Sequence, residues 1–198
     1  MAGHADFNQQ QLSNGGSPVS LGHYLTSADF AVDMAENWQS EYLQFFLYIT
    51  ATVWLVQRGS PESKPAKRIG RETDADQQTG THAHATSPPW ARIGGWRTAL
   101  FSRSLGLVMG GLFLLSWLAQ SVAGVSAYNG SQLAQHEDPL SWGEYLLSAD
   151  FWNRSLQNWQ SEFLALGPMA ILSVYLRQRG SPESKPVGAS HMVTDETG

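Results

Sequence analysis

The sequence predicts an all-α fold: integral membrane helices in two tandem helical repeats of parallel orientation, the first repeat lacking its first span. Three observations predict it: an internal repeat, three uncharged apolar segments, and cations confined to alternate connecting segments. The 198-residue chain has no cysteine, which excludes disulfides, thiolate metal sites and a catalytic thiol. Its net charge of -5 and the lack of a basic stripe argue against a nucleic-acid partner.

The internal repeat relates residues 2–65 to residues 123–186 at a constant interval of 121 residues, without a gap. Of the 64 aligned positions 31 are identical, and most of the matches gather in three blocks. The blocks read SADF at 27–30 and 148–151, NWQSE at 37–41 and 158–162, and QRGSPESKP at 57–65 and 178–186. Between the last two blocks the residues differ but stay apolar, which is typical of a membrane span or a core helix.

The three uncharged apolar segments are 42–56, 104–122 and 163–176. A membrane-spanning helix needs about 20 residues, in a range of about 17–25. The middle segment meets this length. The outer two, of 15 and 14 residues, could also be buried helices of a soluble bundle, so length alone leaves both interpretations open.

The distribution of lysine and arginine favours the membrane. Eleven of the twelve cations fall in 57–103 and 177–198, one, Arg154, falls in 123–162, and none falls in 1–41. Cytoplasmic loops of membrane proteins carry such an excess. We therefore expect a multi-pass protein of the cell membrane, with the N-terminus outside and the C-terminus in the cytoplasm.

Each repeat is expected to contain one long helix, which in the first copy covers Ala28–Val56. Ser27 is a suitable N-cap, and the sequence Arg58-Gly59-Ser60-Pro61 is typical of a helix end. Short helices that begin at proline are expected before the long ones, at 18–25 and 139–146.

The chain then divides into four parts. They are repeat 1 (1–65, with span 42–56), a cytoplasmic linker and interfacial approach (66–103), repeat 2 (104–186, with spans 104–122 and 163–176), and a disordered tail (187–198).

The packing of the spans follows from a stripe of small residues, Ser102, Gly106 and Gly110, which permits close contact between helices. We expect 104–122 to pack against the helix of 149–176. The first repeat's long helix should lie more loosely, or contact the same core through residues that share one face: Phe45, Ile49 and Val53.

Ala2-Gly3 of the first repeat matches Ala123-Gly124, which directly follows a span. The first repeat therefore begins where the first helix of a helical hairpin should already have ended. We expect an apolar stretch of about twenty residues upstream of Met1. Either the start is misassigned or trimmed, which we favour, or an apolar leader was removed like a signal peptide.

The NWQSE blocks hold the strongest candidate binding residues. Asn37 and Glu41 share a helix face, as do Asn158 and Glu162, and Trp38 and Trp159 point to another side. A carboxylate at the outer membrane edge could bind a cation, a lipid headgroup or a partner helix. The alternative is an interface anchor, with tryptophan at the level of the headgroups.

The QRGSPESKP block is longer than a helix end requires, which indicates a contact on the cytoplasmic side or a shared packing role. His82 and His84 form an incomplete metal site in a polar linker, so no metal and no cofactor is expected. No catalytic motif is present, and no catalytic residue is assigned.

Through the SADF, NWQSE and QRGSPESKP blocks the chain resembles an uncharacterised family of bacterial multi-pass membrane proteins, a domain-of-unknown-function family. The resemblance covers nearly the whole chain outside the linker and tail. It implies a bacterial inner-membrane location. It implies no activity, ligand or catalytic residue.

Three function classes follow. The leading class is a non-catalytic membrane protein, either a scaffold or an envelope-associated factor, whose partners are the lipid bilayer and a second copy or another membrane protein. The second class is binding or transport of a small solute or lipid at the repeat interface. An enzyme is the third class, with four outward carboxylates as its only acids: Asp29, Glu41, Asp150 and Glu162.

Overall fold

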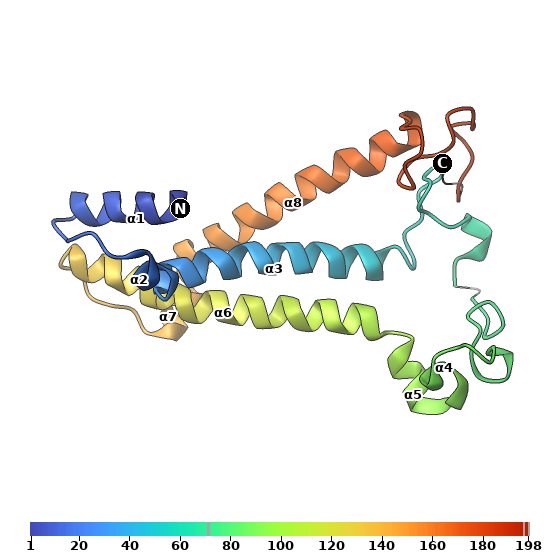
Figure 1. Ribbon diagram of the computed structural model, residues 1–198, viewed down its shortest axis with the longest axis horizontal. Coiled ribbons are helices and arrows are strands. Elements are labelled where there is room, and N and C mark those ends of the chain that lie inside the picture. Colours follow the sequence, from blue (N-terminus) through green and yellow to red (C-terminus); the bar gives the residue numbers. More distant parts are fainter. Residues whose placement is uncertain (71, 196, 198) are drawn as a thin grey trace. The chain divides into compact units, whose positions relative to one another are not determined.

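The computed structural model describes residues 1–70, 72–195 and 197, and these residues form helices, turns and irregular segments without a strand (Figure 1). The α-helices are α1 (Ala2–Ser13), α2 (Leu21–Leu25), α3 (Ala28–Ala51), α4 (Pro89–Ile93), α5 (Gly95–Phe101), α6 (Ser104–Ala134), α7 (Trp142–Leu146) and α8 (Ala149–Tyr175). Two 3-10 turns, Ala66–Arg68 and Gly80–His82, lie in the linker. The all-α class is therefore confirmed for the described residues.

The chain folds as two compact units, each built from two stretches. The first unit combines Met1–Tyr42 with Gly111–Gln160, and the second combines Leu43–Gly110 with Ser161–Gly198. The three long helices α3, α6 and α8 contribute residues to both units.

One helix in the described part of the chain, α6, is long and apolar enough to cross a membrane by length and composition. Its best window has a mean hydropathy of 1.7, and only 17% of that window is buried. A row of its apolar side chains is 51–65% exposed: Leu105, Leu107, Val108, Leu114, Leu115, Leu118 and Val122. The segments 42–56 and 163–176 fall in or beyond the C-terminal halves of α3 and α8, neither of which meets the same criterion.

The first unit contains the same local contacts at an interval of 121 residues. A Cβ atom on Gly3 would lie 2.5 Å from the hydroxyl of Tyr24, and one on Gly124 would lie 2.5 Å from the hydroxyl of Tyr145. The amide of Asn8 exchanges two hydrogen bonds with the backbone of Val19, and Asn129 does so with Leu140. Contacts thus account for the identity at Gly3, Asn8 and Tyr24, which lie outside the three blocks.

Several expected helix ends differ from the observed ones. The short helices begin after serine rather than at proline, because Ser20 and Ser141 accept hydrogen bonds from the backbone N–H groups of His23 and Glu144. Ser27 caps α3 as expected, accepting from the N–H of Phe30 at 3.2 Å.

The helix α3 ends at Ala51 rather than Val56. The hydroxyls of Thr50 and Thr52 bond to the carbonyls of Phe46 and Tyr48, and a run of β-branched residues weakens the helix there.

Within the second unit, the small-residue stripe of α6 does contact α3. A Cβ on Gly106 would lie 3.4 Å from Thr50, and one on Gly110 would lie 3.1 Å from the ring of Phe46. These contacts use Phe46 and Thr50, each one position along the chain from the expected Phe45 and Ile49, and Phe45 and Val53 are 50% and 41% exposed. Ser102, the third residue of the stripe, lies before α6.

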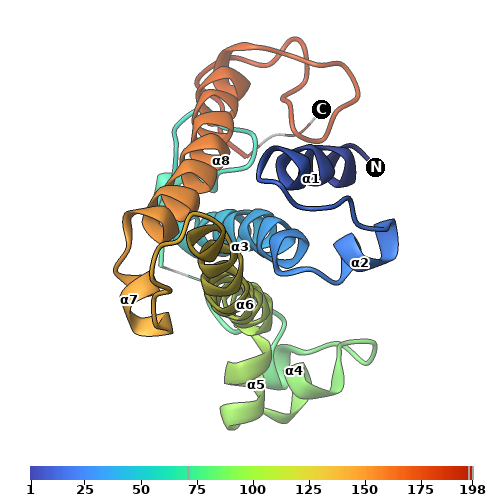
Figure 2. The same ribbon diagram turned by 90° about the vertical axis from the view of Figure 1, so that its left-hand side faces the viewer.

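The expected interfacial approach forms the helix pair α4 and α5, which pack against each other (Figure 2). The hydroxyl of Thr98 donates to the carbonyl of Trp90, and the rings of Trp90 and Trp96 meet edge to face at 6.3 Å. Trp96 and Ile93 stay largely exposed.

The expected packing of 104–122 on the helix of 149–176 is confirmed within the first unit. The indole N–H of Trp117 on α6 donates to Ser155 on α8 at 3.2 Å, and the Trp117 ring stacks on Phe151 at 6.0 Å.

Candidate functional site

The two QRGSPESKP blocks fold into the same turn in the second unit. The backbone N–H of Gln57 donates to the hydroxyl of Ser63, and that of Gln178 donates to Ser184. The turn glycines, Gly59 and Gly180, have φ values of +85° and +79°, which other residues rarely adopt. The recurrence of serine and glycine in the blocks therefore has a structural cause.

The lysines of the two blocks have different roles. Lys185 is fully buried, and its ammonium group donates to the carbonyl of Gly59 at 2.6 Å. It also donates to three carbonyls of the C-terminal tail, those of Ser190, His191 and Val193, at 3.0–3.2 Å. Lys64, its counterpart, pairs with Glu72 instead. One lysine thus ties the second block and the tail to the first block.

The glutamates of the two blocks meet each other. Both glutamates keep exposed surface, and partial desolvation, a hydrogen bond with Glu183 and the charge of Glu183 together raise the pKa of Glu62 to about 7. Two carboxyl groups in such contact are most stable with one proton between them, because two adjacent negative charges repel. This pair therefore holds a proton that can exchange near neutral pH.

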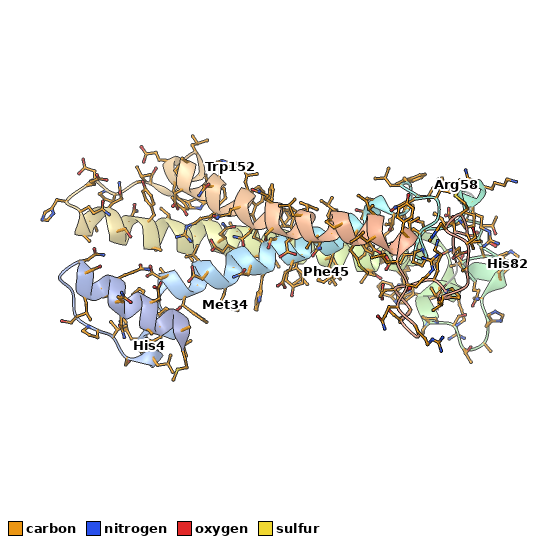
Figure 3. All side chains as sticks on the ribbon, turned by 90° about the horizontal axis from the view of Figure 1, so that it is seen from above. His4, Met34, Phe45, Arg58, His82 and Trp152 are labelled. Carbon is orange, nitrogen blue, oxygen red and sulfur yellow. The ribbon has the colours of Figure 1, made fainter. Side chains whose placement is uncertain are left out.

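The glutamate pair lies at the lining of a cavity of about 590 Å³ in the second unit. The cavity wall comes from the C-terminal half of α3, the residues after it, and α8. Its apolar residues include Phe45 (labelled in Figure 3), Leu55, Val56, Phe163, Leu166 and Met169. Its polar residues include Gln57, Ser60, Glu62, Ser63, Ser173 and Glu183. The size is typical of a small-molecule site.

A hydrogen bond holds the two walls of this cavity together. The side-chain amide of Gln57 donates to the carbonyl of Ala170 on α8 at 3.0 Å. Gln57 follows α3 and opens the first QRGSPESKP block, so the block positions its own glutamate beside α8. The helix α8 also carries Pro168, which lacks an N–H and leaves one carbonyl of the preceding turn without its helical donor.

The candidate binding residues that the sequence predicts in the first NWQSE block lie at the surface. Asn37, Trp38 and Glu41 are exposed, and the amide of Asn37 donates to the carbonyl of Asp33 on its own helix. In the second copy the amide of Asn158 likewise donates to the carbonyl of Arg154. Asparagine in this block thus bonds its own helix in both copies.

Trp159 reaches a partner that sequence analysis did not single out. Its indole N–H donates to the side-chain oxygen of Gln39 at 2.6 Å, and Gln39 is fully buried in the first unit. Trp38, the counterpart of Trp159, is 51% exposed. Glu162 belongs to the second unit and does not line the cavity.

The sequence analysis also did not predict an ionic cluster that the first unit contains. Arg154 donates to Glu36 at 3.1 Å and lies 3.4 Å from Asp150 and 3.9 Å from Asp33. Burial raises the pKa values of Glu36 and Asp33, against the opposing effect of Arg154. A signal was present in the sequence, because Asp33 and Arg154 are matched repeat positions with opposite charges. The hydroxyl of Tyr145 also donates to Asp150 at 3.0 Å.

No group of three or more potential ligands suited to a metal ion occurs in the described residues. His82 and His84 lie exposed in the linker, and Figure 3 shows His82 at the surface. The chemistry of the cavity is therefore that of an apolar chamber with an acidic end, which can hold an apolar body and a positive charge.

The fold and this cavity define a class: an all-helical protein with a helix suited to a membrane and a pocket suited to an amphiphile. A family model described as "Domain of unknown function (DUF6766)" matches residues 1–196, and the chain belongs to this family. The expectation of an uncharacterised family is confirmed at this level. No curated protein and no solved structure matches the chain.

Proposed function

We propose that this chain is a non-catalytic, multi-pass membrane protein that binds an amphiphile in the cavity of its second unit. The membrane part of the proposal is supported by the exposed apolar face of α6 and by the segregation of lysine and arginine. The N-terminus then lies outside and the C-terminus lies in the cytoplasm. The family resemblance supports a bacterial inner membrane.

The two-repeat architecture belongs to the same proposal. The matched contacts of Gly3 with Tyr24 and of Gly124 with Tyr145 support equivalent repeats. Equivalent repeats in a parallel orientation place both QRGSPESKP blocks on the cytoplasmic side. The short apolar segments 42–56 and 163–176 are the outer two spans in this account.

The cavity is the observation that carries the binding function. It draws its apolar wall from the end of α3 and from α8, so both repeat copies contribute to it. A scaffold, the leading class from sequence, has no need of a chamber of about 590 Å³ with a polar end. Binding at the repeat interface is therefore favoured over a scaffold. The bilayer and a second copy of the chain remain the partners that we propose.

Photolabelling tests this function. The purified full-length protein in lipid nanodiscs is exposed to a long-chain alcohol that carries a diazirine, and labelled peptides are mapped by mass spectrometry. We expect labels on cavity residues such as Met169 and Leu55. The variant Ala170→Trp should fill the cavity and reduce those labels several-fold, because Ala170 lines it.

Ala165→Trp is the matched control, since Ala165 is an exposed residue of α8 outside the cavity lining. It corrects for labelling from the surrounding lipid. Equal labelling of cavity residues in the two tryptophan variants would contradict binding in the cavity.

A further inference from the structure

The cavity has a chemical polarity that narrows the class of its ligand. Most of its wall is apolar, whereas Glu62 and Glu183, which contact each other, are the carboxyl groups among the lining residues. An apolar body with a charged or polar head matches such a chamber. The charge of the polar head group that binds beside the two carboxyl groups then decides the class of the ligand.

Among the described residues, the basic groups of the two QRGSPESKP blocks, and Arg177 beside the second block, have other partners or are exposed. No lysine, arginine or histidine is among the lining residues in the described part of the chain, and Tyr48 is the other titratable group there. Lys64 pairs with Glu72, and Lys185 donates hydrogen bonds to backbone carbonyls. Arg177 donates to the carbonyls of Val174, Leu176 and Ala189. Arg58 and Arg179 are exposed. The charged side chain that acts on Glu62 is that of Glu183.

We propose that the cavity binds a monovalent amphiphilic organic cation, an amine or onium ion with an apolar body, whose charge replaces a proton between Glu62 and Glu183. This inference rests on the proposed function, because it names the ligand class of the same cavity. Charge complementarity is the argument for this occupant: an anionic head would meet a carboxyl pair that carries a negative charge, whereas a neutral head would leave the shared proton in place and gain no attraction to that charge.

The exchange conserves charge. Below about pH 7, before binding, the carboxyl pair holds one proton and carries a charge of about -1. The cation brings a charge of +1, the shared proton leaves to water, and both carboxylates are then ionised. The site therefore has the same total charge before and after binding, and one proton is released for each cation.

Proton exchange predicts that cation affinity depends on pH. For competition with a proton of pKa about 7, affinity should fall about tenfold between pH 8 and pH 6. At pH 6, where the pair is mostly protonated, binding should release close to one proton per cation, and at pH 7 about half a proton, which a pH indicator in weak buffer can measure.

The test uses two ions of the same shape and opposite charge, tetraphenylphosphonium and tetraphenylborate. Equilibrium binding of each is measured on the full-length protein in nanodiscs, against empty nanodiscs as background. We expect saturable binding of the cation at least tenfold tighter than that of the anion, with the pH dependence above. Equal affinity for the two ions, or an affinity for the cation that is the same at pH 6 and pH 8, would overturn the proposal.

Variants assign the effect to the carboxyl pair. The double variant Glu62→Gln and Glu183→Gln should lose the preference for the cation and the release of protons. The matched control is Glu41→Gln with Glu162→Gln, which removes two repeated carboxylates outside the cavity lining and should leave both properties unchanged. Loss of both properties in the control alone would also overturn the proposal.

The single variant Glu183→Gln guards against a folding defect in the double variant. It keeps one carboxylate while removing the charge that raises the pKa of Glu62, so cation binding should persist with a weaker dependence on pH. An unchanged pH dependence would contradict the shared proton.

The outcomes separate this inference from the proposed function. If the diazirine alcohol labels the cavity but tetraphenylphosphonium binds no more tightly than tetraphenylborate, the proposed binding function is supported and the proposed cationic ligand is contradicted. If the diazirine alcohol does not label the cavity residues and the phosphonium ion does not bind, both the proposed function and the proposed ligand class are contradicted.

Discussion

The ammonium group of Lys185 lies 2.6 Å from the carbonyl oxygen of Gly59, and this hydrogen bond joins two copies of the same nine-residue sequence. The contact is asymmetric, because Lys64 does not make the reciprocal one but pairs with Glu72. Identical residues at matched repeat positions thus have different partners once the chain folds.

The first prediction concerns this lysine. Lys185→Met keeps the length of the side chain but removes the donor for four carbonyl groups, and we expect a loss of about 1–3 kcal/mol in the free energy of unfolding. The tail around Met192 should become more sensitive to thermolysin. Lys64→Met is the control and should change little, because Lys64 makes a surface ion pair. Equal cleavage of the tail in both variants would contradict the role of Lys185 in holding the tail to the first block.

The second prediction concerns pH and Glu62. Its pKa is raised from 4.5 to about 7 in the folded protein, so the folded state binds more protons than the unfolded state between these values. The stabilising contribution is fully present below pH 4.5 and is lost as the pH rises through about 7. Melting temperatures between pH 5 and pH 8 should therefore decline less in Glu62→Gln than in the parent protein. A steeper decline in the variant would show the opposite sign.

Much of the fold could be predicted from the sequence, for physical reasons that differ between elements. The long helices and the serine cap at Ser27 follow from local patterns, and the contact of Gly106 and Gly110 follows from small residues at helical spacing. The end of α3 could not be placed, because threonine hydroxyls compete for carbonyls well before the glycine and proline signal.

The candidate site was harder to predict. Recurrence of QRGSPESKP indicated a contact, but which residues of the two copies meet depends on tertiary packing. Glu62 and Glu183 occupy matched positions 121 residues apart, and no local pattern pairs them. The NWQSE block drew attention to Asn37 and Glu41, whereas the buried residues of its first copy are Gln39 and Ser40. Exposure at one helix face cannot be read from residue type alone.

The third prediction concerns close packing in the first unit. Gly124→Ala would place a methyl group 2.5 Å from the hydroxyl and 2.9 Å from a ring carbon of Tyr145, which is fully buried. The steric cost of about 1–3 kcal/mol should exceed the gain in helix propensity of about 1 kcal/mol. Thermal melting in detergent should show lower stability for Gly124→Ala. Gly143→Ala meets nothing within 4 Å and should not lower it.

The fourth prediction concerns the ionic cluster around Arg154. Arg154→Met leaves Glu36, whose side chain is 16% exposed, without its donor. We expect a loss of about 1–2 kcal/mol at pH 7.5, less than for a fully buried pair because Arg154 is 37% exposed. The loss should shrink at pH 5, since burial raises the pKa values of Glu36 and Asp33 and both then take up protons more readily. A loss that grows on acidification would contradict this account, and Arg179→Met, at an exposed site, is the control.

The proposed topology is open to one direct measurement, because the chain has no cysteine of its own. Single-cysteine variants Ala134→Cys and Gln77→Cys place a thiol at an exposed position on either side of α6. Intact cells are treated with a membrane-impermeant maleimide, and lysed cells serve as the control for reactivity. The account predicts labelling of Ala134→Cys but not of Gln77→Cys in intact cells, and of both after lysis. The reverse pattern would contradict the orientation, and recovery of the protein in the soluble fraction after detergent-free lysis would contradict the membrane assignment itself.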